Sequence, residues 1–138
     1  MPARDRLHRK VQRALIKDGW SITHDPLTLD FEGVHLFTDM GAEPGFAAEK
    51  QDLSIAIEVK SFFAESPIRE FESTIGQYQI YRIILRSIDP ERKLYLAVSD
   101  LAFKDFFQLP FAQKIMSELP MPMIVVDYFA EEVLQWIR

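Results

Sequence analysis

The sequence predicts an α/β fold in which a central mixed β-sheet is flanked by helices. Apolar residues recur at helical spacing near the N-terminus and again over residues 67–86. Between and after these segments lie short runs that alternate in polarity or are wholly apolar, as strands do. The predicted order is helix, several strands, helix, strand, helices and strands, which is typical of a mixed sheet covered by helices.

Length and composition indicate one globular domain spanning residues 1–138. Hydrophobic residues make up 48% of the chain and charged residues 27%, as in ordinary soluble proteins. The absence of cysteine excludes disulfides, thiolate zinc sites and a cysteine nucleophile. The N-terminal segment lacks the apolar stretch of a signal peptide, and no apolar run approaches membrane-spanning length. We therefore expect a cytoplasmic protein that does not contact membranes.

Positive charge is concentrated in the first 17 residues. This segment holds six Arg or Lys residues and one Asp, a net charge of +5, although the whole chain carries −5. Such polarity allows one face to meet phosphates while the remainder repels them. A solvated helix face is an equally good interpretation.

The N-terminal third is predicted to form a helix followed by strands. The helix is indicated by four apolar residues at i, i+4, i+7 and i+8, namely Leu7, Val11, Ala14 and Leu15. It ends at Asp18-Gly19. A strand follows with Leu27, Leu29 and Phe31 on one face, and a turn at 32–33 leads into a second strand over 34–39.

The middle of the chain is predicted to contain a loop, a hairpin and a helix. Residues 41–45, GAEPG, are expected to form the loop. Residues 46–50 and 53–63 are expected to pair around a tight turn, with the second strand central because Ile55-Ala56-Ile57 is apolar on both faces. Pro67 suits the first turn of the helix that follows.

The C-terminal part is predicted to add strands and short helices. We expect a strand over 93–98, a short helix over 100–107, a helix opening at Pro110, and a closing hairpin of 123–129 with 132–137. The phenylalanines of this part fit the core better than an interface: Phe103, Phe106, Phe107 and Phe111.

Two charged residues stand at the end of the central strand. Residues i and i+2 of a strand point to the same face, so Glu58 and Lys60 project together. A carboxylate can bind a hard cation such as Mg²⁺, and an ammonium beside it can orient water or stabilise charge on a phosphate. The spacing also occurs at Glu91 and Lys93, so solvated strand-end charges are the favoured interpretation on spacing alone.

A metal site for phosphoryl chemistry needs a second carboxylate. Asp39 ends a predicted strand and converges on Glu58 if the two strands are neighbours, although a turn residue before Gly41 is an equal alternative. Glu43 is a second candidate because it immediately precedes the hairpin, and Glu49 is a weaker third.

A glutamine on the long helix is a further candidate. Gln77 lies one turn before Tyr81, so both share a helix face, and a helix packed beside the strand could aim Gln77 at the site. An exposed glutamine is the favoured alternative on spacing. Gly76 costs about 1 kcal/mol relative to Ala within a helix, which hints at a close contact there. His8, on the first helix with Asp5, could border a site but fits the basic face better.

Six segments together are far more specific than the Glu-x-Lys spacing: ARDRLHRKVQRALIKDGWSITHDPLTL, DMGAE, AAEKQDLSIAIEVKSF, GQYQIYR, ERKLYLAV and LQWI. Over essentially its whole length the chain resembles the XisH family, excision controlling factors associated with removal of a DNA element from the fdxN gene. The resemblance implies a restriction-endonuclease-like fold of the PD-(D/E)xK superfamily, whose core is a helix, three strands, a helix and a strand.

The resemblance also implies roles for individual residues. Asp39 matches the acid of the second core strand, Glu58 and Lys60 match the acid-x-lysine motif, and Gln77 matches a glutamine of the following helix. Thr38 stands where the motif has proline, which leaves the choice between Asp39 and Glu43 open.

Three functional interpretations follow, because a fold alone does not establish an activity. The first is a Mg²⁺- or Mn²⁺-dependent DNA phosphodiesterase. The second is a noncatalytic accessory factor that binds DNA or a partner and directs a recombinase. The third is an aromatic interaction module. The partners implied are DNA, an XisI-type companion protein and a site-specific recombinase, and a homodimer is possible.

Overall fold

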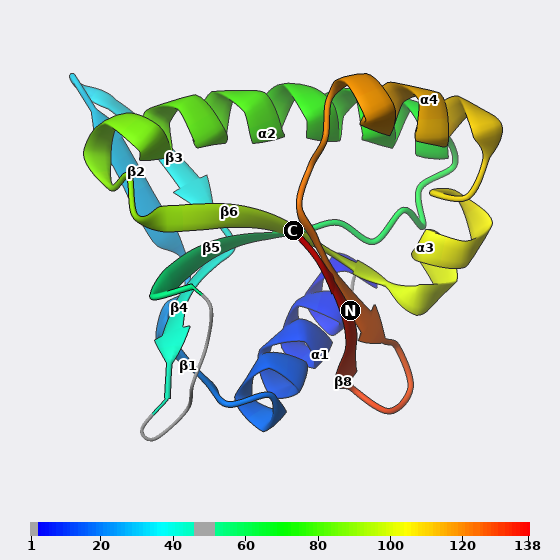
Figure 1. Ribbon diagram of the computed structural model, residues 1–138, viewed down its shortest axis with the longest axis horizontal. Coiled ribbons are helices and arrows are strands. Elements are labelled where there is room, and N and C mark those ends of the chain that lie inside the picture. Colours follow the sequence, from blue (N-terminus) through cyan, green and yellow to red (C-terminus); the bar gives the residue numbers. More distant parts are fainter. Residues whose placement is uncertain (1–2, 46–51) are drawn as a thin grey trace.

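The structure is a computed structural model that describes residues 3–45 and 52–138 (Figure 1). In chain order its elements are α1 (Ala3–Lys17), β1 (Trp20–His24), β2 (Leu27–Phe31), β3 (Val34–Thr38), β4 (Met40–Pro44), β5 (Ser54–Val59), α2 (Pro67–Ile88), β6 (Arg92–Ser99), α3 (Asp100–Asp105), α4 (Pro110–Glu118), β7 (Met123–Asp127) and β8 (Glu132–Ile137). None of the helices in this part of the chain is long and apolar enough to span a bilayer.

A six-stranded mixed sheet in the order β1-β4-β5-β6-β7-β8 forms the centre of the molecule. β5, β6 and β7 run parallel, whereas β1, β4 and β8 join by antiparallel pairing. β5 has a partner on each side, so its predicted central position is confirmed. The predicted α/β class, with a mixed sheet flanked by helices, is confirmed as well.

The two faces of the sheet hold separate cores, which fixes the direction of the β5 side chains. Ile55, Ile57 and Val59 pack with the α1 residues on one face, whereas Ala56 packs with Phe71 of α2 on the other. Figure 1 shows α1 and α2 on opposite faces. The α1 stripe, Leu7, Val11, Ala14 and Leu15, is fully buried as predicted.

β2 and β3 form a separate two-stranded ribbon joined at Glu32 and Gly33, which both have positive φ. Its covered side contributes Leu27 and Leu29 to the core beneath α2. Phe31, predicted to share that face, lies at the tip of the ribbon with 36% of its surface exposed.

The segment GAEPG, predicted to be a loop, is instead part of β4. Met40, Gly41 and Ala42 pair with β5, and β1 pairs along the other edge of the same strand. Gly and Pro are depleted in strands, so the local sequence does not indicate that β4 is a strand. The antiparallel partner of β5 is therefore β4, and residues 46–50, predicted as that partner, lie outside the described residues.

The predicted elements of the C-terminal half are confirmed. α2 begins at Pro67, where Ser66 Oγ accepts a hydrogen bond from the Arg69 amide at 3.3 Å. β7 and β8 form the predicted hairpin. Of the phenylalanines expected in the core, Phe106 and Phe107 are buried, whereas Phe111 is 48% exposed.

Gly76 does not make the close contact that its place in a helix suggests. A Cβ atom added there meets no described atom within 4 Å. We therefore expect Gly76→Ala to raise the free energy of unfolding by about 1 kcal/mol, because alanine loses less backbone entropy in a helix. Chemical denaturation of the variant and the wild type measures the change.

Gly41→Ala provides the contrasting variant, since a Cβ there lies 3.1 Å from Arg92 Nη1, which is itself held by the Ile55 carbonyl. We expect this second variant to be destabilised. Equal effects of the two substitutions would contradict the account.

Candidate functional site

Glu58 and Lys60 lie together at the C-terminal end of β5, on the face that α2 covers. The Lys60 amide donates to the Ala97 carbonyl at 3.1 Å, which extends the pairing with β6 beyond the last strand residue. Lys60 Nζ lies 3.6 Å from Glu58 Oε2, and their side chains are 15% and 6% exposed. Since a solvated pair would be far more exposed, the structure contradicts that interpretation.

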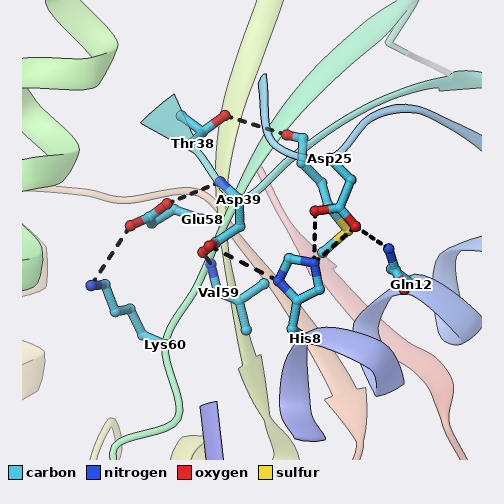
Figure 2. Close-up of polar contacts among 9 residues, drawn as sticks. His8, Gln12, Asp25, Thr38, Asp39, Glu58, Val59 and Lys60 are labelled. Carbon is cyan, nitrogen blue, oxygen red and sulfur yellow. Dashed lines mark hydrogen bonds and ion pairs between the residues drawn. The ribbon is translucent and has the colours of Figure 1, made fainter. Parts of the chain in front are cut away.

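Asp39 joins this pair through the backbone. It lies between β3 and β4, and its Oδ2 accepts a hydrogen bond of 2.7 Å from the Val59 amide. In return, the Asp39 amide donates to Glu58 Oε1 at 3.3 Å. These two hydrogen bonds join the start of β4 to the C-terminal end of β5, and we call this arrangement the Asp39–Glu58 clasp. Figure 2 shows the two side chains side by side.

The other candidate acids do not join the pair. Glu43 is 52% exposed and reaches Arg92, with 4.0 Å between Oε1 and Nη2. Its neighbour Ala42 pairs with Ile55 at the opposite end of β5 from Glu58. Glu49 and the side chain of Asp5 lie outside the part of the structure that is described.

Gln77 lies on the flank of α2 that turns toward β5. The residues Phe71, Tyr78 and Leu85 of α2 face the core. One flank of the helix lines a cavity beside the α4–β7 connection, so this flank is on the β7 side. β5 and β7 lie on either side of β6. The opposite flank of α2 is therefore on the β5 side.

The β5-facing flank carries three buried oxygens at i, i+4 and i+7. Glu70 Oε2, Thr74 Oγ1 and Gln77 Oε1 have no hydrogen-bond partner within residues 6–45 and 52–138. Buried acceptors of this kind are normally satisfied. Among the described side chains, no hydrogen bond joins Gln77 directly to Glu58 or Lys60.

His8 lies at this site, although its sequence position fits the basic face of α1 better. Its Nδ1 lies 3.9 Å from Asp39 Oδ1, and its Nε2 lies 3.0 Å from Asp25 Oδ1. Gln12, one turn further along α1, also donates to Asp25. In Figure 2, His8 and Asp25 flank Asp39 on the side away from Lys60. The sequence indicates this position of His8 only through its neighbour Leu7, because the histidine ring then lies at the edge of the buried stripe of α1.

The family model described as XisH protein matches residues 1–134 of the chain. The chain belongs to the XisH family. The resemblance seen in the sequence is thereby confirmed. A comparison with curated proteins found no match.

Two crystal structures of XisH relatives are similar over their whole length. An XisH family protein from Nostoc punctiforme PCC 73102 is 43% identical, with 97% of this chain and 100% of that one covered at a TM-score of 0.86. An fdxN element excision controlling factor protein from Anabaena variabilis is 45% identical, with 98% and 100% covered at a TM-score of 0.87.

The basic residues of α1 in this XisH chain are partly used for internal contacts. Glu131, at the β7–β8 turn, accepts from Arg13 at 2.8 Å and from Lys10 at 3.3 Å. The hydrogen bond from Arg13 lowers the pKa of the Glu131 carboxyl. Lys17 donates to the Ala130 carbonyl. These contacts reduce the positive charge available to phosphates, while Arg6 and Arg9 remain exposed.

The donor set at the β5 end suits a hard divalent cation. Asp39 and Glu58 offer carboxylate oxygens, the ligands that suit Mg²⁺ and Mn²⁺. His8 adds an imidazole beside Asp39. Among the described side chains, no three His, Asp or Glu residues are already converged as ligands. The buried, unpartnered Gln77 oxygen on the facing helix nevertheless fits a site that receives water or a cation.

Proposed function

We propose that this XisH protein is a controlling factor for excision of a DNA element and carries a Mg²⁺- or Mn²⁺-dependent DNA phosphodiesterase site. The controlling role is supported by the Anabaena variabilis relative, which is 45% identical over its whole length and bears that description. The phosphodiesterase site is supported by one observation above all: Asp39, Glu58 and Lys60 lie together at the end of one buried strand.

Each residue has a distinct role in this proposal. Asp39 and Glu58 hold the cation, with His8 beside Asp39. When bound, the cation neutralises charge on the phosphate and lowers the pKa of water. Lys60 orients the attacking water and stabilises the charge that develops on the phosphate oxygens. Gln77 hydrogen-bonds a water or phosphate oxygen from α2.

The restriction-endonuclease-like fold of the PD-(D/E)xK superfamily is part of the same proposal. α1, the strands β1, β4 and β5, α2 and β6 follow the order of helix, three strands, helix and strand expected of that core, with the β2–β3 ribbon added between β1 and β4. Partners in this role are DNA, an XisI-type companion protein and a site-specific recombinase, and the cytoplasm is where the protein would meet them.

A noncatalytic accessory factor is the second candidate. The observation that favours it is the clasp itself, because Asp39 and Glu58 are both engaged by backbone amides and thereby stabilise the end of β5 without any cation. In that case the protein binds DNA or its companion and the recombinase makes every cut.

Calorimetric titration with Mn²⁺ tests the cation site. We expect the wild type to bind Mn²⁺, and Glu58→Gln and Asp39→Asn each to weaken binding at least about tenfold, because each removes one charged oxygen ligand. Glu43→Gln is the matched control, since this acid lies at the other end of β5 and should leave the affinity unchanged. Equal weakening by Glu43→Gln, or no Mn²⁺ binding by the wild type, would argue for the accessory role.

A further inference from the structure

A cavity of about 440 Å³ lies between the C-terminal half of α2, the start of β6 and the α4–β7 connection. It is on the β7 side of α2, whereas Glu58 and Lys60 lie on the β5 side, and it shares no residue with that site. Its volume falls in the range of about 300–1,000 Å³ that is typical of small-molecule sites.

The lining of this cavity is strongly basic in a chain whose net charge is −5. Arg82 and Arg86 come from α2, and Arg92 and Lys93 come from β6. The only acid in the lining, Glu118, lies 3.8 Å from Lys114 on its own helix, and both side chains are over 70% exposed. Four basic residues therefore contribute to the lining, and its single acid has a partner on its own helix.

Arg92 and Lys93 have structural roles, but Arg82 and Arg86 do not. Lys93 Nζ lies 5.3 Å from the centre of the Tyr95 ring, which packs with α1 on the other face of the sheet. Arg92 donates to Asp89 at 3.0 Å and to the Ile55 carbonyl at 2.9 Å. Within residues 6–45 and 52–138, by contrast, no carboxylate forms an ion pair with Arg82 or Arg86.

Arg82 is oriented without being neutralised. Gln79 Oε1 accepts hydrogen bonds from Arg82 Nε at 3.2 Å and from Nη2 at 2.7 Å. A neutral acceptor fixes the guanidinium plane and leaves its charge intact. Arg86, one turn further on, repels Arg82, since like charges at i and i+4 destabilise a helix. The cluster is thus an arrangement that a bound anion would stabilise.

The opposite wall of the cavity is apolar. It is formed by Leu119, Pro120 and Pro122 of the α4–β7 connection, and the buried Tyr78 of α2 also lines the cavity. The Tyr78 hydroxyl donates to the Leu94 carbonyl at 2.9 Å, and burial raises its pKa to about 12, against an opposing effect of Arg82. The phenol therefore stays neutral, and the cavity has one cationic side and one apolar side.

We propose that this cavity binds a nucleoside polyphosphate. Arg82 and Arg86 contact the phosphate groups, for which guanidinium groups are well suited, and the base lies against Leu119, Pro120 and Pro122. The inference does not depend on the phosphodiesterase site, because the two sites lie on opposite flanks of α2.

Isothermal titration with ATP tests this site, alongside inorganic triphosphate and adenosine as partial ligands. We expect ATP to bind more tightly than either, because it engages both walls. Arg82→Gln and Arg86→Gln should each weaken ATP binding on the order of tenfold, since each removes a charge-assisted hydrogen bond. Arg82→Lys keeps the charge but loses the Gln79 contact, so it should weaken binding less than Arg82→Gln.

Lys104→Gln is the control, because this exposed lysine belongs to α3 and does not line the cavity. Circular dichroism verifies that each variant is folded. The proposal is overturned if the wild type does not bind ATP at about 1 mM, or if Arg82→Gln and Arg86→Gln bind as tightly as Lys104→Gln. It is also overturned if these arginines affect only binding of duplex DNA, because the cavity would then be part of a DNA surface.

Discussion

Lys60→Met is expected to lower the rate of metal-dependent DNA cleavage at least about 100-fold, which is the usual effect of removing one group that stabilises transition-state charge. The ammonium of Lys60 lies 3.6 Å from Glu58 Oε2 and is mostly buried, so no mobile surface charge can replace it. Nicking of supercoiled DNA at saturating Mg²⁺ measures the effect.

Measuring Mn²⁺ binding distinguishes a loss of transition-state stabilisation by Lys60 from a loss of the bound cation. Lys60→Met should bind Mn²⁺ at least as tightly as the wild type, since it removes a positive charge beside Glu58. Lys104→Met on α3 is the matched control and should cleave at the wild-type rate. If Lys60→Met cleaved DNA normally, Lys60 would be only a structural counter-ion of Glu58.

Asp39→Ala is expected to reduce the free energy of unfolding by about 2 kcal/mol as well as abolish cleavage. The alanine leaves the Val59 amide without its 2.7 Å acceptor, and an unsatisfied backbone donor at a partly buried position costs about 1–3 kcal/mol. Chemical denaturation without added metal measures the loss.

Two variants show that this loss comes from the clasp. Asp39→Asn retains an acceptor oxygen for Val59, so it should recover most of the stability but none of the cleavage. Asp30→Ala removes an exposed acid whose partner is His35 on the β2–β3 ribbon, and such a pair contributes about 1 kcal/mol or less. An Asp39→Ala variant no less stable than Asp30→Ala would contradict the clasp.

The helices and the central strand were predictable because their signals are local. Leu7, Val11, Ala14 and Leu15 occupy one stripe of α1 whatever that helix packs against. β4 was not predictable, since Gly41 and Pro44 oppose strand formation locally. It forms because β1 and β5 pair with it on both edges.

The same distinction applies to the site. That Glu58 and Lys60 share a face follows from the two-residue period of a strand, so spacing alone predicted it. That Asp39 rather than Glu43 reaches them depends on the Val59 amide, twenty positions along the chain. The approach of His8 depends on how α1 packs against the sheet. The Asp39 contact leaves no local signal in the sequence, and the only local signal of His8 is its position beside Leu7.

Cleavage of supercoiled plasmid DNA is the most direct test of the central proposal. Purified wild-type protein is incubated with plasmid and Mg²⁺ or Mn²⁺, with and without an XisI-type companion. Glu58→Gln is compared with Glu91→Gln, an acid with the same spacing to a lysine but at the start of β6. We predict metal-dependent nicking by the wild type and by Glu91→Gln, and none by Glu58→Gln. Intact plasmid in every reaction, even with the companion present, would contradict the phosphodiesterase and leave the Asp39–Glu58 clasp as a structural element of an accessory factor.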